Sequence, residues 1–309
     1  MATPSAKLEP AEPEDLPGAW AVYLACTRPE DQSGCRQAAP DRPDLPPPLY
    51  AHLLLTSEGA FWVARYEDQV VGFAAAVTRG RLWWLSELWV APGFRGRGIG
   101  SALLRKVRRA SRGVRGRVLA GLTGPDGAGM VLGLRAGMWA RYPVFTVEGG
   151  QEAAERLRRA NPLPPGARMA RYDAAAKLGP RSPLLRLDRE VLGGTRADDH
   201  VFWMTHGGRT CLLLWKGNRA LAYAYLGTGG EVGPLAAAGP QGLRSALGLV
   251  VSKAARKSET VRLRIPGINQ VALKAVLDAG FQLVADSQLL ASEEFGCLER
   301  YLPGDESLF

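Results

Sequence analysis

The sequence predicts an α/β fold, of the α+β kind, arranged as two tandem copies of one domain. Its 309 residues are enough for two ordinary domains, each with its own core. Strand-like and helix-like segments follow one another in both halves of the chain. The second half also repeats the first, because residues 118–138 (VLAGLTGPDGAGMVLGLRAGM) align without a gap with residues 261–281 (VRLRIPGINQVALKAVLDAGF).

Other segments support the repeat. The hairpin-like residues 61–76 match residues 211–226, and the helix start SALL at 101–104 matches SALG at 245–248 when Glu87 is placed opposite Glu231. Two copies of one domain explain these matches best. We therefore expect a first domain at residues 1–150, a linker at residues 151–165 and a second domain at residues 166–309.

The elements of the first copy can be taken in order. Residues 7–17 contain a short edge strand and a helix start, and the acidic Glu14 and Asp15 suit the positive end of that helix. The Pro-rich residues 27–48 form a loop. The elements expected after it are a helix at 49–56, strands at 60–66, 69–77 and 81–90, a helix after the turn at 91–100, a strand at 118–122, a helix at 130–138 and a strand at 142–148.

Composition excludes several classes of protein. Hydrophobic residues make up 46% of the chain and charged residues 22%, which is typical of globular rather than disordered protein. No apolar run approaches the roughly 18 residues of a membrane span, and the first residues lack a secretory pattern. We expect a cytoplasmic protein with no membrane partner. The four cysteines lack C-x-x-C spacing, and with three histidines they predict no metal site.

Residues 85–104 hold the clearest functional motif, a turn between a hydrophobic strand and an apolar-periodic helix. The turn is rich in Arg and Gly, so its backbone can approach a ligand closely just before helix amides that lack intrahelical acceptors. Such a turn suits a bound phosphate. It matches neither the dinucleotide pattern G-x-G-x-x-G nor a Gly-Lys-Ser/Thr phosphate loop. The alternative is an ordinary turn with Arg for solubility.

The motif Arg95-x-x-Gly98-x-Gly100, after a strand that ends at Val90, resembles the pyrophosphate loop of the GCN5-related N-acetyltransferase (GNAT) family. The resemblance implies a mixed, mostly antiparallel sheet flanked by helices in each domain. It also implies acetyl-CoA as co-substrate and transfer of its acetyl group to a primary amine of a small molecule or peptide. The residues that would contact acetyl-CoA are Leu88, Trp89 and Val90 on the strand, and Arg95, Gly96, Arg97, Gly98, Ile99, Gly100 and Ser101 in the loop and helix start.

Direct transfer needs a base, because an amine with a pKa near 10 is mostly protonated at neutral pH. Glu87, just before the cofactor-contacting residues, is the candidate, directly or through a water. The alternative is a structural ion pair with an arginine such as Arg81. The family often supplies a tyrosine to protonate the leaving thiolate, but that position is Gly133 here. Tyr142 is the substitute we consider, with a packing role as the alternative.

The second copy departs from the motif, since Gln241-Gly242-Leu243-Arg244 stand opposite Arg97-Gly98-Ile99-Gly100. We expect the second domain not to bind coenzyme A in the usual way and to have a structural role. After residue 138 the first copy has one strand, whereas the second has two, at 281–290 and 297–302. This difference suggests that the first sheet borrows its last strand from the second copy.

Three function classes remain at this point. The first is an N-acetyltransferase with its active site in the N-terminal domain, and its rival is a non-catalytic acyl-CoA sensor or scaffold, which Gly133 favours. The third is nucleic-acid binding through the Arg-rich residues 105–117, given the net charge of +9, but no recognised nucleic-acid module accompanies them. The acceptor pocket is expected near residues 27–48 and around Tyr50 and His52. Trp83, Trp84 and Trp89 either line that pocket or pack in the core. The chain is expected to be a monomer of two fused domains or a homodimer.

Overall fold

The computed structural model describes residues 6–27, 46–110, 117–124, 127–172 and 178–309. The chain divides into two compact units. Unit 1 consists of Met1–Ala140 and Leu290–Glu293, and unit 2 consists of Arg141–Leu289 and Glu294–Phe309. The boundaries expected for the two copies, at residues 150 and 166, stay a prediction. Among the residues just given, no helix has the length and apolar character needed to cross a membrane.

Unit 1 contains a mixed, mostly antiparallel sheet in the order β1-β2-β3-β4-β5. Its strands are β1 (Lys7–Pro10), β2 (Phe61–Tyr66), β3 (Gln69–Arg79), β4 (Leu82–Val90) and β5 (Val118–Thr123). The first four pair antiparallel, and β5 pairs in parallel with β4. The sheet type expected from the sequence is therefore confirmed.

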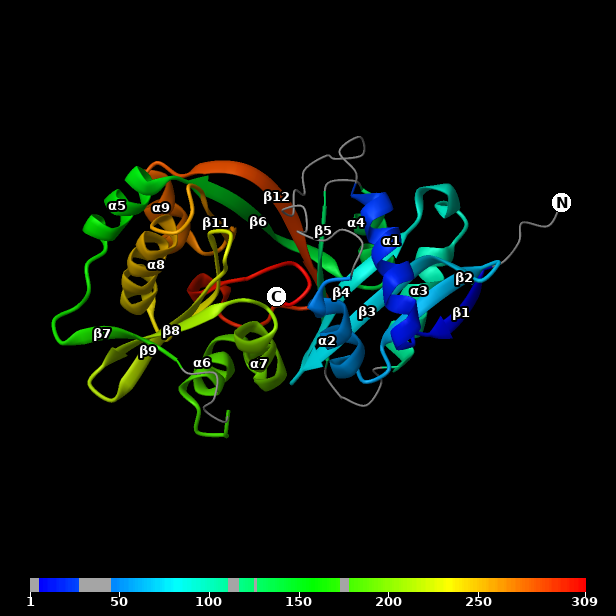
Figure 1. Ribbon diagram of the computed structural model, residues 1–309, viewed down its shortest axis with the longest axis horizontal. Helices are drawn as coiled ribbons and strands as arrows, with labels where there is room; N and C mark the ends of the chain where they lie inside the picture. The colour runs from blue at the N-terminus through cyan, green and yellow to red at the C-terminus, as the bar shows by residue number, and fades with distance from the viewer. Residues whose placement is uncertain (1–5, 28–45, 111–116, 125–126, 173–177) are drawn as a thin grey trace. The chain divides into compact units, whose positions relative to one another are not determined.

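Helices cover both faces of this sheet (Figure 1). On one face lies α3 (Ile99–Ala110), whose Leu103 and Val107 are fully buried while Arg105 and Arg109 are exposed. This spacing is the apolar stripe of an amphipathic helix. On the other face lie α1 (Leu16–Cys26) and α2 (Pro48–Thr56). A further helix, α4 (Ala128–Arg135), follows β5.

A segment from far along the chain completes unit 1. The amide of Ser292 donates to the carbonyl of Leu119 on β5 at 2.8 Å, and the Leu119 amide donates to Ser292 Oγ at 3.0 Å. Leu290, at the end of β12 (Gln282–Ala291), is 3% exposed and belongs to the core beneath α3. The expectation that the first sheet borrows chain from the second copy is therefore confirmed.

The sheet strands of unit 2 follow one another in the order β12-β6-β11-β10-β9-β8-β7. Its other strands are β6 (Trp139–Gly149), β7 (Ala167–Arg171), β8 (Thr210–Lys216), β9 (Arg219–Leu226), β10 (Glu231–Ala237) and β11 (Val261–Pro266). A two-residue strand, β13 (Tyr301–Leu302), pairs with β10. The strands β7 to β10 pair antiparallel, and β10 pairs in parallel with β11.

The strand β9 shows how the faces of this sheet are assigned. Its Ala222 and Ala224 lie in the core beneath α5 (Gln151–Ala160), α8 (Pro240–Ala255) and α9 (Gln270–Asp278). The alternating Tyr223 and Tyr225 point to the opposite face, toward α6 (Pro183–Leu192) and α7 (Ala197–Thr205). Helix α5 also forms the first part of the linker expected at residues 151–165. It packs on α8, where Ser252 Oγ donates to Glu155 Oε1 at 3.1 Å.

Candidate functional site

The candidate site begins where β4 separates from β5. The two strands pair in parallel up to Leu85, opposite Gly121, and β4 then continues to Val90. The amide of the next residue, Ala91, donates to β3 at 2.9 Å. Because backbone groups alternate along a strand, those of Leu88 and Val90 point to the other side, away from β3. The end of β4 therefore presents N–H and C=O groups along the edge beyond its pairing with β5.

A β-bulge in β4 sets the direction of Glu87. Between Leu85 and Glu87 the register with β3 shifts, so Ser86 is an extra residue. The shift reverses the alternation of side chains. Leu85 packs in the core beneath α3, whereas Glu87 and Trp89 lie on the face that carries α1 and α2.

The loop after β4 contains two glycines that need their special conformation. Gly96 has φ +75° and Gly98 has φ +80°, in the left-handed region that disfavours side chains. A Cβ built on either residue would meet no heavy atom within 4 Å. The backbone conformation, and not a lack of space, therefore favours glycine at both positions. The space beside them is open to a ligand.

The helix start points amides into the same loop. Helix α3 begins at Ile99, and the Ala102 amide donates a hydrogen bond back to the Gly98 carbonyl at 3.0 Å. The amides of Ile99, Gly100 and Ser101 have no acceptor in the preceding turn of the helix. With the positive end of the helix dipole, they form a binding site for an anion.

Two arginine side chains donate hydrogen bonds to carbonyl groups in or next to the loop. Arg95 Nε donates to the carbonyl of Val90 at 3.2 Å, and Arg97 Nη2 donates to the carbonyl of Gly93 at 3.0 Å. The Arg97 guanidinium also lies over the ring of Phe94, 5.0 Å from its centre. Both arginines are exposed, so they hold the loop and add positive charge at its surface.

Glu87 lies within a cluster of aromatic side chains. Its exposed fraction is 7%, and Trp89 Nε1 donates a hydrogen bond to its Oε2. The ring of Tyr23 stands edge-on to Trp89 with centres 5.1 Å apart, and Trp20 stacks on Tyr23 at 4.9 Å. Tyr50 is edge-on to Trp20 at 5.7 Å. Aromatic rings from α1, α2 and β4 thus surround the carboxylate.

Tyr50 brings a second polar group to this cluster. Burial, and next the negative charge of Glu87, raise the pKa of the Tyr50 hydroxyl far above its ordinary value. The hydroxyl is buried and makes no hydrogen bond with any residue that the structure describes. It therefore stays protonated and is available to a bound molecule. Most of the loop expected beside it, residues 28–45, lies outside the described residues.

Trp20 and Tyr23 are the site residues that sequence reasoning missed. Their helix, LPGAWAVYLAC, is apolar on every side, so no periodic pattern shows which side chains face the site. For the other aromatics the outcome is mixed. Trp83 and Trp84 are 0% and 2% exposed and pack in the core, whereas Trp89 is partly exposed beside Glu87.

The proposed ion pair between Glu87 and Arg81 does not fit the geometry. The two residues are separated by six positions of extended chain, or roughly 20 Å. Arg81 Nη2 instead lies 3.4 Å from Glu293 Oε1, and both side chains are exposed. Arg81 therefore cannot neutralise Glu87.

The missing tyrosine has a structural explanation in unit 1. A Cβ built on Gly133, in α4, would lie 2.2 Å from Leu290 Cδ1. Leu290 belongs to the borrowed segment and is itself buried. A side chain at residue 133 therefore needs the space that Leu290 fills.

Tyr142 lies in unit 2, on β6, whereas Glu87 lies in unit 1. Its hydroxyl donates to Glu294 Oε1 at 3.0 Å. Partial burial first, and then the hydrogen bond and charge of Glu294, raise the pKa of Tyr142. These contacts supply a structural reason for this tyrosine, which supports its packing alternative.

The second copy lacks the whole loop. In unit 2 only Ala238 and Gly239 connect β10 to α8, so residues 241–244 lie in the first turns of the helix, and Leu243 is fully buried. The bulge of β10 falls between Val232 and Leu235, which places Leu235, and not Glu231, opposite Glu87. Matched by their bulges, the two strands place Glu87 opposite a position four residues beyond Glu231.

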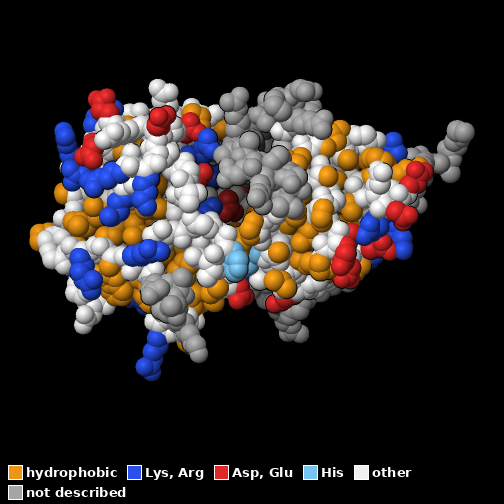
Figure 2. Space-filling view, viewed as in Figure 1, with side chains coloured by type: hydrophobic (Ala, Val, Ile, Leu, Met, Phe, Trp, Pro, Cys, Tyr) orange, Lys and Arg blue, Asp and Glu red, His pale blue; other side chains and the backbone are white. Residues whose placement is uncertain are grey.

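Positive charge is not confined to the loop of unit 1. Figure 2 shows Lys and Arg side chains spread over the part of unit 2 that carries β7, β8 and α8. Arg168, Lys216 and Lys253 are exposed members of these elements. In α3, Lys106 lies over the ring of Trp62 at 4.5 Å and Arg108 donates to the Ala136 carbonyl at 3.0 Å. Basicity alone therefore does not single out a nucleic-acid surface.

Comparison with known proteins agrees with these features. Residues 26–126 match the model of the acetyltransferase (GNAT) family, and no curated protein sequence matches the chain. A structure described as an acetyltransferase from Pyrococcus horikoshii is similar over 100% of this chain and 98% of its own, with 15% identity and a TM-score of 0.74. A tandem GNAT protein from the clavulanic acid biosynthesis pathway is similar over 93% and 98%, with 17% identity and a TM-score of 0.59. A GCN5-related N-acetyltransferase from Sphaerobacter thermophilus is similar over 98% of both chains, with 13% identity and a TM-score of 0.57.

The fold of the whole chain is similar to that of structures with two GNAT domains in one chain. Residues 26–126 match the GNAT family model, and the whole chain has the tandem GNAT fold.

Proposed function

We propose that unit 1 is an N-acetyltransferase that moves the acetyl group of acetyl-CoA to a primary amine. The observation that carries the proposal is the open Gly96–Gly98 turn at the start of α3, beside the end of β4, whose edge toward β5 has no strand partner after Leu85 among the described residues. Anion-binding amides and a strand edge lie in sequence along one path. That path suits a ligand with a diphosphate at one end and amide groups along its length.

The loop residues would bind the diphosphate of acetyl-CoA. Ile99, Gly100 and Ser101 would donate their amides, while Arg95 and Arg97 offset its charge. Leu88 and Val90 would exchange backbone hydrogen bonds with the amide-bearing arm, as a neighbouring strand does. The carbonyl oxygen of Val90 already accepts hydrogen bonds from Arg95 and from Cys26 Sγ, the latter at 3.3 Å. The backbone amide of Val90 is therefore the group that would bind the arm.

Glu87 would act as the base. Its carboxylate would take a proton from the acceptor ammonium, directly or through a water, and the neutral amine would then form a bond to the thioester carbon. The carbon–sulfur bond breaks as the amide forms, and coenzyme A leaves as a thiolate. Since Leu290 fills the space beside Gly133, the proton that the thiolate needs would come from water or from the amine's second proton.

The test uses two glycines of the same loop. Gly98→Val forces a β-branched residue into φ +80°, while Gly93→Val is a matched control, because Gly93 has open space and no left-handed φ. We expect calorimetry to show about one equivalent of acetyl-CoA binding to the native chain and to Gly93→Val, and at least tenfold weaker binding to Gly98→Val. Equal binding by all three would remove the loop from the proposal.

The second candidate function is a non-catalytic acyl-CoA sensor. The contact between Gly133 and Leu290 favours it, because it leaves no room for the usual proton donor. A thiol-release assay with a panel of primary amines separates the two functions. Release with any amine supports the enzyme, whereas tight binding without release supports the sensor.

A further inference from the structure

The second unit contains a strand where the first has an open edge. In unit 2, β10 and β11 pair in parallel only from Glu231 to Val232, and the bulge of β10 follows. Beyond it β13 pairs antiparallel with β10, with Leu302 opposite Leu235 and Tyr301 opposite Ala236. The strand β13 also contacts β11. It therefore lies in the wedge between the two diverging strands.

The same wedge in unit 1, between β4 and β5, is the path that we assign to the arm of acetyl-CoA. We propose that residues 301–309, named here the strap, occupy the corresponding cleft of unit 2 as an internal substitute for that ligand. The equivalence of the two clefts rests on the proposed function of unit 1. The position of the strap rests only on contacts within unit 2.

The backbone of the strap approaches β10 very closely. A Cβ on Gly233, whose φ is +139°, would lie 2.6 Å from the carbonyl oxygen of Pro303. Asn269 Nδ2 donates to the Tyr301 carbonyl at 3.2 Å, and Arg264 Nη1 donates to the Gly304 carbonyl at 3.1 Å. Side chains from β11 and from the start of α9 thus bind strap carbonyls, as a neighbouring strand would.

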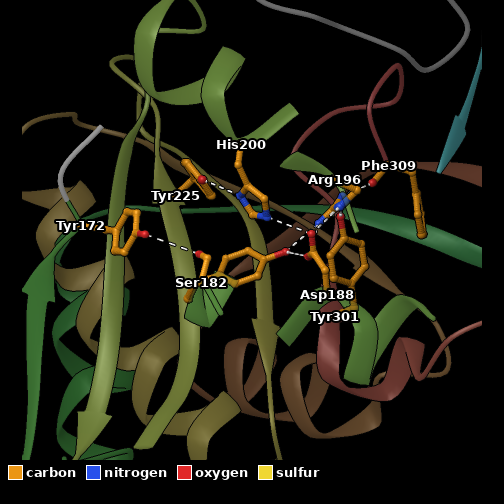
Figure 3. A network of polar contacts seen from close by, with 9 residues as sticks. Tyr172, Ser182, Asp188, Arg196, His200, Tyr225, Tyr301 and Phe309 are labelled. Carbon is orange, nitrogen blue, oxygen red and sulfur yellow. Dashed lines mark hydrogen bonds and ion pairs between the residues drawn. The ribbon is translucent and has the colours of Figure 1, made fainter. Parts of the chain in front are cut away.

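A buried polar network fixes the first and last residues of the strap (Figure 3). Arg196 Nη1 donates to Tyr301 Oη at 2.8 Å and also to the backbone oxygen of Phe309. Arg196 is held in turn by Asp188, with Nη2 and Oδ1 3.2 Å apart, and Asp188 Oδ2 lies 2.8 Å from His200 Nε2. All of these side chains, those of Tyr301 and Phe309 included, are at most 4% exposed.

A second ion pair holds the middle of the strap. Arg209 Nη2 lies 3.0 Å from Asp305 Oδ2, and Arg209 Nη1 donates to the carbonyl of Gly233 on β10. These two side chains are 14% and 19% exposed. Substituting them should therefore lower the free energy of unfolding less than a change in the buried network would.

The consequence is that unit 2 cannot accept coenzyme A while the strap is in place. The missing loop between β10 and α8 removes the anion site as well. Unit 2 therefore lacks both parts of the ligand path. The anion-binding loop is absent, and the strap fills the space between β10 and β11. The whole chain should bind one equivalent of acetyl-CoA.

Hydrogen–deuterium exchange of the full chain tests the strap. We expect the amides of Leu302 and its neighbours to exchange at least 100-fold more slowly than those of an unfolded peptide, with no change at saturating acetyl-CoA. Faster exchange of the strap in the presence of acetyl-CoA would mean displacement and would overturn the proposal, as would an unprotected strap. The same experiment measures whether acetyl-CoA slows amide exchange at residues 88–101. No slowing there would contradict the proposed function of unit 1 without bearing on the position of the strap.

The Asp305→Ala variant gives a second measurement, with Val284→Ala, at an exposed position of β12, as its control. We expect Asp305→Ala to speed exchange of the strap at least tenfold while β8 and β9 keep their protection. We also expect it to gain no second equivalent of acetyl-CoA. An exchange rate equal to that of the control would show that the ion pair does not hold the strap.

Discussion

At the scale of the residue, the extra position at Ser86 determines what Glu87 can do. Strict alternation from Trp83 and Leu85 would place Glu87 beneath α3, in an apolar core. The bulge instead turns it toward Tyr23 and the other rings of α1 and α2. Bulges commonly redirect side chains at functional sites. Sequence reasoning selected Glu87 by resemblance, but periodicity alone would have given it the wrong face.

Replacing Glu87 tests its role as a base. The Glu87→Gln variant keeps an oxygen that can accept from Trp89, so the local packing should persist. We expect kcat for amine acetylation to fall about 100-fold with the affinity for acetyl-CoA unchanged, because a general base contributes roughly that factor or more. Activity should recover in part at higher pH, where more of the amine is neutral. An unchanged kcat would assign Glu87 a structural role.

Gly133 offers a test of packing against the borrowed segment. The Gly133→Tyr variant restores the tyrosine that the family resemblance leads one to expect, but Leu290 fills its space. We expect a loss of about 1–3 kcal/mol in the free energy of unfolding, measured by denaturant titration. The double variant with Leu290→Ala should lose less than the sum of the two single changes. Simple additivity would contradict the contact.

At the scale of the element, most helices and strands follow from the sequence pattern, and connections do not. The expected strands at 60–66, 69–77 and 81–90 agree with β2, β3 and β4 within a few residues. By contrast β13 consists of Tyr301 and Leu302 alone, too short for any periodic signal, and only its partner strand defines it. The absence of the loop before α8 could not be predicted either, because the two copies were aligned without a gap at that place.

The elements α6 and α7 carry a network whose stability should depend on pH. Burial raises the pKa of Asp188, but the charges of Arg196 and His200 outweigh it, so the pKa in the folded chain lies below the ordinary 3.8. A carboxyl with a lowered folded pKa stabilises the protein above its unfolded pKa, and that contribution is lost as the pH falls through the folded value. Unit 2 should therefore lose stability progressively below about pH 4.

Thermal unfolding followed between pH 7 and pH 2 measures this effect. The Asp188→Asn variant should be less stable by about 3–5 kcal/mol at pH 7, since it leaves the Arg196 charge buried without its partner. Its unfolding temperature should also depend less on pH below 4 than that of the native chain. Parallel curves for the two proteins would exclude Asp188 as the titrating group.

At the scale of the whole molecule, unit 1 depends on chain that is distant in sequence. Leu290–Glu293 complete unit 1, although the rest of that unit ends at Ala140. The repeat in the sequence predicted two copies and hinted at the borrowing through their unequal number of strands. The boundaries expected at residues 150 and 166 come from the repeat alone, whereas the extent of each compact unit also depends on contacts made after the chain has folded.

A chain cut after residue 150 should expose this dependence. It would lack Ser292, which bonds both backbone groups of Leu119, and Leu290, which fills the core beneath α3. We expect residues 1–150 alone to unfold at a lower temperature than unit 1 does in the full chain, and to bind a dye specific for exposed apolar surface. Adding the peptide of residues 282–293 should raise that temperature. An equally stable fragment would show that the borrowed segment is dispensable.

The borrowed segment also bears on how the protein is made. A ribosome that has released residues 1–140 has not yet supplied Leu290, so the nascent first unit waits with an open edge on β5 and a gap in its core. At typical rates of synthesis the delay is on the order of ten seconds. During translation the first unit is thus the vulnerable half until the residues of β12 have been synthesised.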